Sequence, residues 1–358
     1  MNHALVRDDR PLPLRLGGSL PSHEIAYETW GRLNAKRDNA VLVAAGISAS
    51  SHVRAGELNA EPGYWDEMVG PGRAIDTDRF FVVSGAWLGG CFGTTGPSSP
   101  RPGSGTPYGP DFPMLTLHDL AASLLRLLDA LGIERLHACV GSSLGAMVVL
   151  ALAADAPGRS GRVLCISGTG WTRPGALAIR YLQRSCILLD PAFQGGRYPG
   201  GRGPKTGLAI ARQLGFTTYR SPGEWNERFG RARPEGPHGY LADFDVDRYL
   251  DYQGTKFAEG YDANTYLVLS KAMDLFDLRG GDGTLRSGLA AVSEPVLVIG
   301  IDSDLLMPIE EQEEIAAAVA GRNGGTQFRR FSSLYGHDAF LKEFTLFTPP
   351  MRQFLHSS

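Results

Sequence analysis

The sequence predicts an α/β fold in which a mostly parallel sheet carries helices on both faces and is interrupted by a helical insertion. Five short apolar runs predict the sheet: NAVLVAAGI (39–47), RFFVVSGAW (79–87), RLHACVG (135–141), GRVLCISGT (161–169) and EPVLVIGID (294–302). Their hydrophobicity is continuous rather than alternating, which indicates strands that are covered on both faces. Helical patterns lie between several of the runs, and this alternation is typical of a mostly parallel sheet.

The stretch TLHDLAASLLRLLDALGI (116–133) predicts a helix between two of these strands. Leucine recurs in it at three- and four-residue spacing, which places these side chains on one face of a helix. Thr116 or one of its neighbours is a candidate N-cap, and Gly132 stands near the end, where glycine is favoured. We therefore expect an amphipathic helix over about this range.

The pattern changes after about residue 170. From 176 to 280 the sequence predicts helices and loops, and strand character returns only at Pro295. The simplest organisation is an α/β core, residues 1–170 and 288–358, interrupted by a mainly helical lid, residues 171–287. Such a lid is expected to lie over the carboxyl ends of the strands.

Composition and charge exclude several classes of function. With 43% hydrophobic and 20% charged residues, the chain has the composition of a soluble globular protein. The net charge of -3 gives no basic footprint for nucleic acid, and no apolar run is long enough to span a bilayer. The N-terminal segment lacks the apolar stretch of a secretory signal. We expect a cytoplasmic protein that binds neither nucleic acid nor a membrane.

The four cysteines are widely spaced and form no CxxC pair, so the sequence predicts no metal site. Cys139 and Cys165 lie in apolar strand-like runs and are interpreted as small buried thiols. Cys91, in GGCFGTTG, is an alternative nucleophile, but no histidine stands near it in the sequence.

A candidate nucleophile lies in the segment Gly141-Ser142-Ser143-Leu144-Gly145, between a predicted strand and a predicted helix. Gly-x-Ser-x-Gly in this context is typical of a nucleophile elbow, a sharp turn that lifts the serine hydroxyl out of the sheet. Glycines flank the serine because side chains there would collide with the strand and the helix. Ser143 is the predicted nucleophile, and Ser142 is a small residue that the turn tolerates. The Leu144 N–H is then free to stabilise an oxyanion.

A serine nucleophile needs a histidine base and an acid that orients it. On such elbows the acid and then the histidine follow the serine along the chain. His337, in FSSLYGHDAFL (331–341), is the predicted base; its alternative role is that of a buried structural histidine. Asp302 and Asp304, just past a late strand, compete for the acid, and Asp304 is favoured because it lies further into the loop.

The oxyanion site needs a second N–H from the loop after an early strand. The segment AAGISASSH (44–52) is placed for this, with Ile47 as the expected donor. A serine nucleophile predicts acyl transfer without naming the acceptor: water gives a hydrolase, whereas an alcohol or amine gives a transferase.

Several further motifs have no general structural meaning, and together they are specific. They are IAYETWGRLNA (25–35), GPGRAIDTDRFFVV (70–83), LGGCFGTTGPSS (88–99), PYGPDFP (107–113), GSSLGAM (141–147), LDYQGTKF (250–257) and GHDAF (336–340). Through them the chain resembles the homoserine O-acetyltransferase family of α/β-hydrolase-fold acyltransferases over nearly its whole length.

The resemblance implies an α/β-hydrolase fold and a double-displacement reaction. Ser143 takes an acyl group from acyl-CoA, and the hydroxyl of an amino acid then attacks the acyl-enzyme. By the same resemblance Asp304 orients His337, Asp338 binds the amino group of the substrate, and Arg212 binds its carboxylate, which suits a bidentate pair. It also implies a homodimer, and acyl-CoA as a co-substrate with no further cofactor.

The branch of the family is indicated by departures from the acetyltransferase pattern. The loop Gly46-Ile47-Ser48-Ala49 replaces the usual residues after the early strand and is the expected determinant of the acceptor. AIRYLQRS (178–185) and TTYRSPGEWNERFGR (217–231) are similar to the serine O-succinyltransferase branch. Succinyl carries a carboxylate that acetyl lacks, and burying it needs a cation. Arg180 is the expected partner, and a surface-facing arginine is the alternative.

The sequence thus predicts transfer of a succinyl group from succinyl-CoA to L-serine, in cysteine biosynthesis. One alternative is a homoserine O-acetyl- or O-succinyltransferase of methionine biosynthesis, with acetyl-CoA or succinyl-CoA as donor and L-homoserine as acceptor. An alternative of another class is an esterase or thioesterase.

Overall fold

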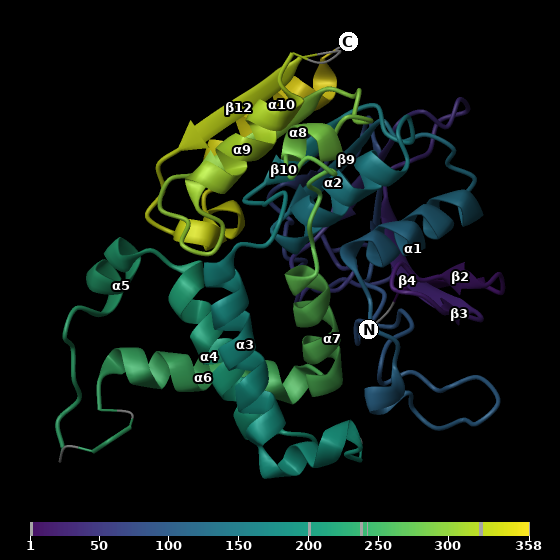
Figure 1. The fold of residues 1–358 in the computed structure, drawn as a ribbon. Coiled ribbons are helices and arrows are strands. Elements are labelled where there is room, and N and C mark those ends of the chain that lie inside the picture. The colour runs from purple at the N-terminus through teal and green to yellow at the C-terminus, as the bar shows by residue number, and fades with distance from the viewer. Residues whose placement is uncertain (1–2, 200–201, 237–238, 242, 322–324, 358) are drawn as a thin grey trace.

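An eight-stranded sheet forms the centre of the computed structural model, which describes residues 3–199, 202–236, 239–241, 243–321 and 325–357 (Figure 1). Its strands, in spatial order, are β1 (Ala4–Asp8), β4 (His23–Trp30), β8 (Phe81–Gly85), β5 (Ala40–Ala44), β9 (Ala138–Ser142), β10 (Val163–Ile166), β11 (Val296–Ile301) and β12 (Thr326–Phe331). The strands from β8 to β12 pair in parallel, and β4 pairs antiparallel with β1 and β8. The predicted α/β fold with a mostly parallel sheet is confirmed.

Two short strand pairs lie outside this sheet. They are β2 (Leu12–Pro13) with β3 (Ser19–Leu20), and β6 (Val69–Gly70) with β7 (Ile75–Asp76). Short 3₁₀ segments occur at η1 (Gly109–Asp111), η2 (Pro191–Gly196) and η3 (Gly336–Leu341).

All five predicted apolar runs contain strands, namely β5, β8, β9, β10 and β11. The structure adds β1, β4 and β12, which the sequence analysis did not predict. In β1 partly buried and exposed positions alternate up to the buried Asp8, and β12 is an edge strand whose Arg329 and Arg330 are exposed. Neither strand therefore has the continuous apolar run that marks a strand covered on both faces.

Helices cover both faces of the sheet. On one face lie α1 (Leu117–Ala130), α2 (Leu144–Asp155) and α9 (Ile309–Val319), whose side chains pack with Leu42 and Val298. On the other face α10 (Phe344–His356) packs with Val43 and Ile299. Because successive residues of a strand point to opposite faces, burial on both sides requires the continuous apolar runs seen in the sequence.

The helix predicted at 116–133 is α1. Thr116 is its N-cap, and its backbone N–H and hydroxyl both donate to one carboxylate oxygen of Asp119, at 2.7 and 2.8 Å. After the helix ends, Gly132 has a φ of 67°, a left-handed conformation that glycine adopts without steric cost. Both predicted helix-end signals are confirmed.

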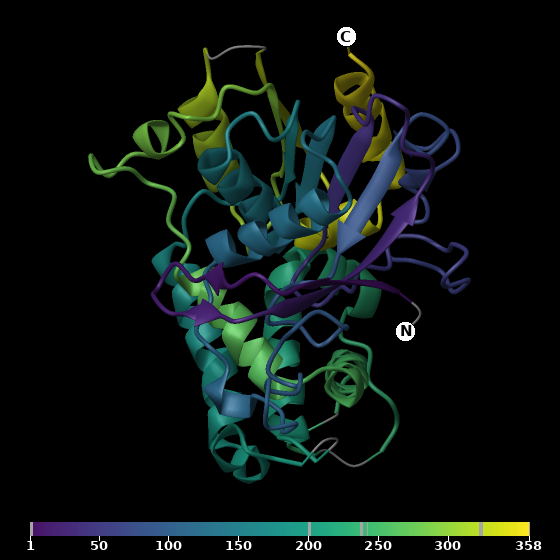
Figure 2. The same cartoon turned by 90° about the vertical axis from the view of Figure 1, so that its right-hand side faces the viewer.

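Between β10 and β11 the described chain forms helices rather than strands, and Figure 2 shows most of them on one side of the sheet. They are α3 (Pro174–Leu189), α4 (Lys205–Tyr219), α5 (Pro222–Phe229), α6 (Asp245–Gly260), α7 (Ala263–Asp274) and the short α8 (Leu285–Gly288). Ile187, Leu208, Tyr261 and Tyr266 belong to a separate apolar cluster within this insertion. We propose that the helices α3 to α7 act as a lid, with the core and lid divided near 171 and 287.

Candidate active site

Ser143 lies in the sharp turn between β9 and α2, with φ 55° and ψ -122°. This backbone conformation is strained for a residue with a side chain. A Cβ atom at Gly141 would lie 2.2 Å from the carbonyl oxygen of Gly145, and one at Gly145 would lie 2.0 Å from that of Ala44. Only glycine fits at both flanking positions, as expected for a nucleophile elbow. Ser142 is the last residue of β9 and is buried.

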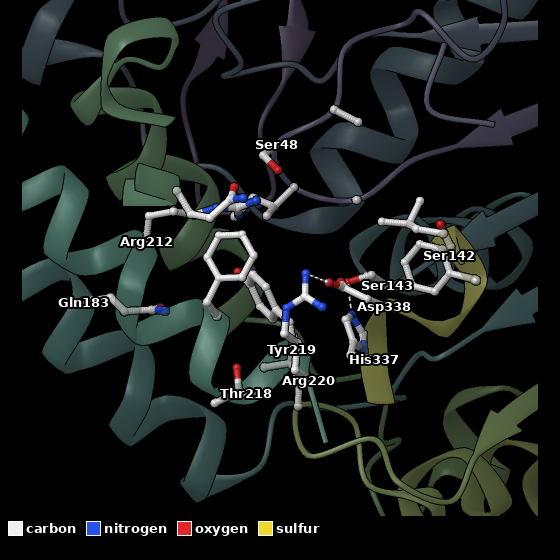
Figure 3. Close-up of a pocket in the computed structure, with 18 of the residues that line it drawn as sticks. Ser48, Ser142, Ser143, Gln183, Arg212, Thr218, Tyr219, Arg220, His337 and Asp338 are labelled. Atoms are coloured by element: carbon white, nitrogen blue, oxygen red, sulfur yellow. Dashed lines mark hydrogen bonds and ion pairs between the residues drawn. The ribbon is translucent and has the colours of Figure 1, made fainter. Parts of the chain in front are cut away.

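A continuous hydrogen-bond chain joins Ser143, His337 and Asp304. The Nε2 atom of His337, in η3, lies 2.8 Å from the Ser143 hydroxyl oxygen, and its Nδ1 lies 2.7 Å from a carboxylate oxygen of Asp304. All three side chains are buried. Figure 3 shows His337 and Ser143 side by side in the wall of a cavity. This arrangement can pass the serine proton to the imidazole.

Asp302 and Asp304, the two candidates for the acid, lie in different surroundings in the loop after β11. The second carboxylate oxygen of Asp304 accepts hydrogen bonds from the N–H groups of Leu306 and Met307, both at 2.9 Å. Asp302 instead accepts a hydrogen bond from the Ser332 hydroxyl at 2.5 Å, on the surface. Asp304 is therefore the aspartate that faces the imidazole.

The environment of His337 suits a general base. Burial acts to lower the pKa of the imidazole, but the charge and hydrogen bond of Asp304 outweigh burial, so the pKa lies above its ordinary value. A raised pKa makes the imidazole a stronger proton acceptor when it is neutral.

Both expected oxyanion donors, the N–H groups of Ile47 and Leu144, are without an acceptor among the described residues. Ile47 lines the cavity, and Leu144 directly follows Ser143 at the first position of α2. A buried N–H without a partner is costly, and a bound oxyanion would satisfy it.

The cavity has a volume of about 510 Å³ and is lined by the core and by the proposed lid together. Its walls bring together nearly all the site residues expected from the sequence. They are Gly46, Ile47, Ser48, Ala49, Ser143, Arg180, Arg212, His337 and Asp338. Of the expected site residues, Asp304 lies behind His337, and Leu144 lies behind Ser143.

Arg212, on α4, enters the cavity without a carboxylate partner. Its guanidinium carbon lies 4.8 Å from the ring centre of Phe216, 5.3 Å from that of Tyr219 and 4.6 Å from that of Phe257. Among the described residues no hydrogen bond or ion pair engages it, and its buried Nε atom has no acceptor. Aromatic rings hold the cation in place and leave its hydrogen-bonding edge for a ligand.

Arg180, on α3, is buried rather than surface-facing and has a carboxylate partner. Its Nε atom donates to Asp274 of α7 at 2.6 Å, and Asp274 also accepts a hydrogen bond from Arg184. Among the described residues no partner engages the terminal nitrogens of Arg180, which lines the cavity. Arg180, the expected cation, thus lines the cavity, but it forms an ion pair with Asp274, an acid that the sequence analysis did not identify.

Asp338 lies next to an arginine that the sequence analysis missed. Arg220, which follows α4, lies 4.0 Å from the Asp338 carboxylate and is hydrogen-bonded to Glu224 and Tyr249 (Figure 3). Burial raises the pKa of Asp338, and the positive charges of His337 and Arg220 oppose that rise. No local pattern marks Arg220, because it meets Asp338 only when α4 packs against η3.

The remaining sequence alternatives lie outside this site. Burial raises the pKa of the Cys91 thiol to about 11, which makes it a poor nucleophile, and Cys91 lines a different cavity. Cys139 and Cys165 are buried as predicted.

In the part of the chain that the structure describes, no group of three or more His, Cys, Asp or Glu side chains could hold a metal ion. None of the described helices is long and apolar enough to cross a membrane.

Comparison with known proteins shows the family to which the chain belongs. Residues 39–344 match the alpha/beta hydrolase fold family. The chain is 43% identical to a serine O-succinyltransferase of Litchfieldella anticariensis over 97% of both chains. It is 45% identical to a homoserine O-acetyltransferase of Symbiobacterium thermophilum over 97% of this chain and 92% of that one. The chain belongs to the homoserine O-acetyltransferase family of α/β-hydrolase-fold acyltransferases.

The solved structures similar to this chain include both an acyltransferase and an esterase. A homoserine O-acetyltransferase from Bacillus anthracis superposes with a TM-score of 0.92 at 27% identity, covering 100% of this chain and 99% of that one. Esterase E22 superposes with a TM-score of 0.90 at 28% identity, covering 99% of each chain. Because acyltransferase and esterase have the same overall fold, the fold does not distinguish their substrates, and only the residues of the cavity can.

Proposed function

We propose that this acyltransferase-family protein transfers a succinyl group from succinyl-CoA to the hydroxyl of L-serine, a step of cysteine biosynthesis. One observation carries the proposal: the Ser143–His337–Asp304 chain opens into a cavity that also holds the Asp338 carboxylate and Arg212, an arginine with no acidic partner among the described residues. The first feature suits acyl transfer, and the second suits a zwitterionic amino acid. The serine O-succinyltransferase relative supports the choice of substrates.

In the first half-reaction, the Ser143 hydroxyl attacks the thioester carbonyl while Nε2 of His337 takes its proton. The N–H groups of Ile47 and Leu144 stabilise the oxyanion. The C–S bond then breaks, the imidazolium gives its proton to the CoA sulfur, and the acyl group remains as an ester of Ser143. Asp304 stabilises the imidazolium and fixes the imidazole in the tautomer that carries a proton on Nδ1.

In the second half-reaction, His337 takes the proton of the acceptor hydroxyl, whose oxygen attacks the acyl carbon of the acyl-enzyme. The bond from that carbon to the Ser143 oxygen then breaks, and the imidazolium returns its proton to Ser143. Asp338 pairs with the ammonium group of the acceptor, and Arg212 pairs with its carboxylate through a bidentate contact. The loop from Gly46 to Ala49 lines the space next to Ser143 and sets the acceptor length. The reaction needs acyl-CoA as a co-substrate and no further cofactor.

The donor preference depends on Arg180. Asp274 holds its Nε atom, so the guanidinium is oriented before the donor binds. Its terminal nitrogens have no partner among the described residues and suit the carboxylate of a succinyl group. An acetyl group offers no such partner.

Two other functions have specific support. A homoserine O-acetyl- or O-succinyltransferase is supported by the homoserine O-acetyltransferase of Symbiobacterium thermophilum. Both alternatives differ from the proposal in the length of the acceptor, and the acetyltransferase differs also in the donor. An esterase or thioesterase is supported by the likeness to esterase E22. An esterase has no need of Arg212 and Asp338 in the cavity, so we rank it below the transferases.

The test is a matrix of L-serine and L-homoserine against succinyl-CoA and acetyl-CoA, scored by kcat/KM for CoA release. We expect the serine and succinyl-CoA pair to give the highest value. Faster turnover of homoserine would overturn the acceptor, and faster use of acetyl-CoA would overturn the donor. CoA release at the full rate without any amino acid would identify a thioesterase.

We further propose a cytoplasmic homodimer. The support for a dimer is the outer face of α3, where five large apolar side chains are exposed: Leu177, Tyr181, Leu182, Leu188 and Leu189. Several large apolar side chains exposed on one helix are typical of a protein interface, and two-fold pairing of α3 would cover them on both copies. Light scattering of the wild type and of a Leu182→Glu variant tests this, and a wild-type monomer would refute it.

A further inference from the structure

Trp87 holds the loop that carries the expected oxyanion donor. Its indole N–H donates to the carbonyl oxygen of Gly46 at 3.1 Å, and the Ala49 N–H donates to the same oxygen at 3.3 Å. Trp87 is only 3% exposed and packs in the core of the sheet. The Gly46 carbonyl is therefore fixed from the core side of the loop.

The direction of this carbonyl also sets the direction of the next N–H. The peptide group is planar and trans, so the carbonyl of Gly46 and the N–H of Ile47 point in opposite directions. With the carbonyl directed at the Trp87 indole, the Ile47 N–H is directed away from it, on the side where Ile47 lines the cavity. Rotation of this one peptide would remove the donor from the oxyanion.

Tyr261, from the helical insertion, holds the following peptide group. Its hydroxyl donates to the carbonyl oxygen of Ile47 at 3.0 Å. The tyrosine stands between α6 and α7, is buried, and stacks on Phe257 with ring centres 4.6 Å apart. Two successive carbonyls of one loop are thus held by two rigid aromatic side chains, one from the core and one from the helical insertion.

We propose that Trp87 and Tyr261 are positioning residues for acyl transfer: together they aim the Ile47 N–H at the oxyanion and couple the lid to that donor. The inference rests on the proposed role of Ile47 and deepens it. The two side chains touch no reacting atom, so their removal acts through the direction of the Ile47 N–H.

The test measures acylation of Ser143 by p-nitrophenyl acetate, an activated ester that needs neither CoA nor an amino acid. Trp87→Phe and Tyr261→Phe each remove one hydrogen-bond donor and keep an aromatic ring. The controls are Trp171→Phe, whose indole nitrogen has no hydrogen-bond partner among the described residues, and Tyr252→Phe, whose side chain is 61% exposed on α6.

We expect each test variant to lower the acylation rate constant about 10-fold with little change in half-saturation, because a donor is misaimed rather than deleted. The controls should stay within about twofold of the wild type. The double variant should lose less than the product of the single losses, since both side chains hold one loop.

Wild-type acylation rates in both test variants would overturn the inference, as would a lower melting temperature with unchanged rates. A change confined to half-saturation would also overturn it, because an oxyanion donor acts on the rate of the chemical step. Should Trp87→Phe fail to fold, Tyr261→Phe alone decides the outcome. The proposed function can fail in the CoA assays while this ester assay still succeeds, so the two failures are distinguishable.

Discussion

In the core, the polar atoms of the Ser143–His337–Asp304 chain hydrogen-bond to one another or to backbone N–H groups. The insertion, by contrast, brings Arg212 into the same cavity with no acidic partner in the part of the chain that the structure describes. Arg180 and Arg220, from the same insertion, have acids beside them. Among the described residues, the core chain is thus hydrogen-bonded throughout, whereas Arg212 and the terminal nitrogens of Arg180 remain for a ligand. On the proposed function, the core carries out acyl transfer, and the insertion supplies the cations that bind the carboxylates of the donor and the acceptor.

The largest effect is expected in the core, where Asp304→Asn should lower kcat about 10⁴-fold, because the amide cannot hold the imidazole in the required tautomer. The measurement is CoA release from succinyl-CoA in the presence of L-serine. Asp302→Asn is the matched control in the same loop and should leave kcat within about twofold of the wild type. A large loss in the Asp302 variant with activity retained in the Asp304 variant would reverse the assignment.

In the insertion, Arg212→Gln should lower kcat/KM for the acceptor about 100-fold, since the variant loses a charge-assisted pair to the substrate carboxylate. The kcat/KM for the donor belongs to the other half-reaction and should change little. Arg228→Gln, an exposed arginine on α5, is the control. Equal losses for donor and acceptor would contradict the assignment of Arg212 to the acceptor.

A smaller change is expected at Arg180. Arg180→Gln should lower the ratio of kcat/KM for succinyl-CoA over acetyl-CoA about 10-fold, because a glutamine cannot pair with the succinyl carboxylate. Arg184→Gln is a close control, since Arg184 binds the same Asp274 but does not line the cavity. An unchanged ratio in the Arg180 variant, or an equal fall in the Arg184 variant, would refute the donor assignment.

The smallest change is a shift of pH dependence at Arg220. Burial raises the pKa of Asp338, and the positive charges of nearby side chains oppose that rise; they are His337, Arg220, Arg212 and Lys342. Arg220 also donates a hydrogen bond to Glu224, a second acid beside it. Loss of the Arg220 charge therefore raises this pKa further, so the carboxylate protonates at a higher pH and can no longer pair with an ammonium group. In Arg220→Gln the acid limb of the acceptor kcat/KM profile should move to higher pH. Arg220→Lys, which keeps the charge, should restore it; an unmoved limb would refute the role.

Patterns in the sequence were enough to predict the sheet centre and the residues of the Ser143–His337–Asp304 hydrogen-bond chain. Continuous apolar runs and the elbow around Ser143 follow from backbone geometry within a few residues, and the order of serine, acid and histidine along the chain is typical of folds with such an elbow. The choice of Asp304 over Asp302 needed only the position along one loop.

Contacts between distant elements could not be predicted in this way. Asp274 meets Arg180 across 94 residues of sequence, and Tyr261 meets Ile47 across 214. The role of Arg220 likewise depends on how α4 and η3 pack. The strands β1 and β12 were missed because their side chains are not buried on both faces.

The central claim is that the acyl group travels through Ser143 and leaves only to an amino acid. Mass spectrometry of the protein mixed with succinyl-CoA, before and after addition of L-serine, tests this most directly, with Ser143→Ala as the control. The account predicts one succinyl group on Ser143 that persists without an acceptor, disappears on addition of serine and is absent from the variant. An unmodified Ser143, or a succinyl ester that water removes as fast as serine does, would contradict it.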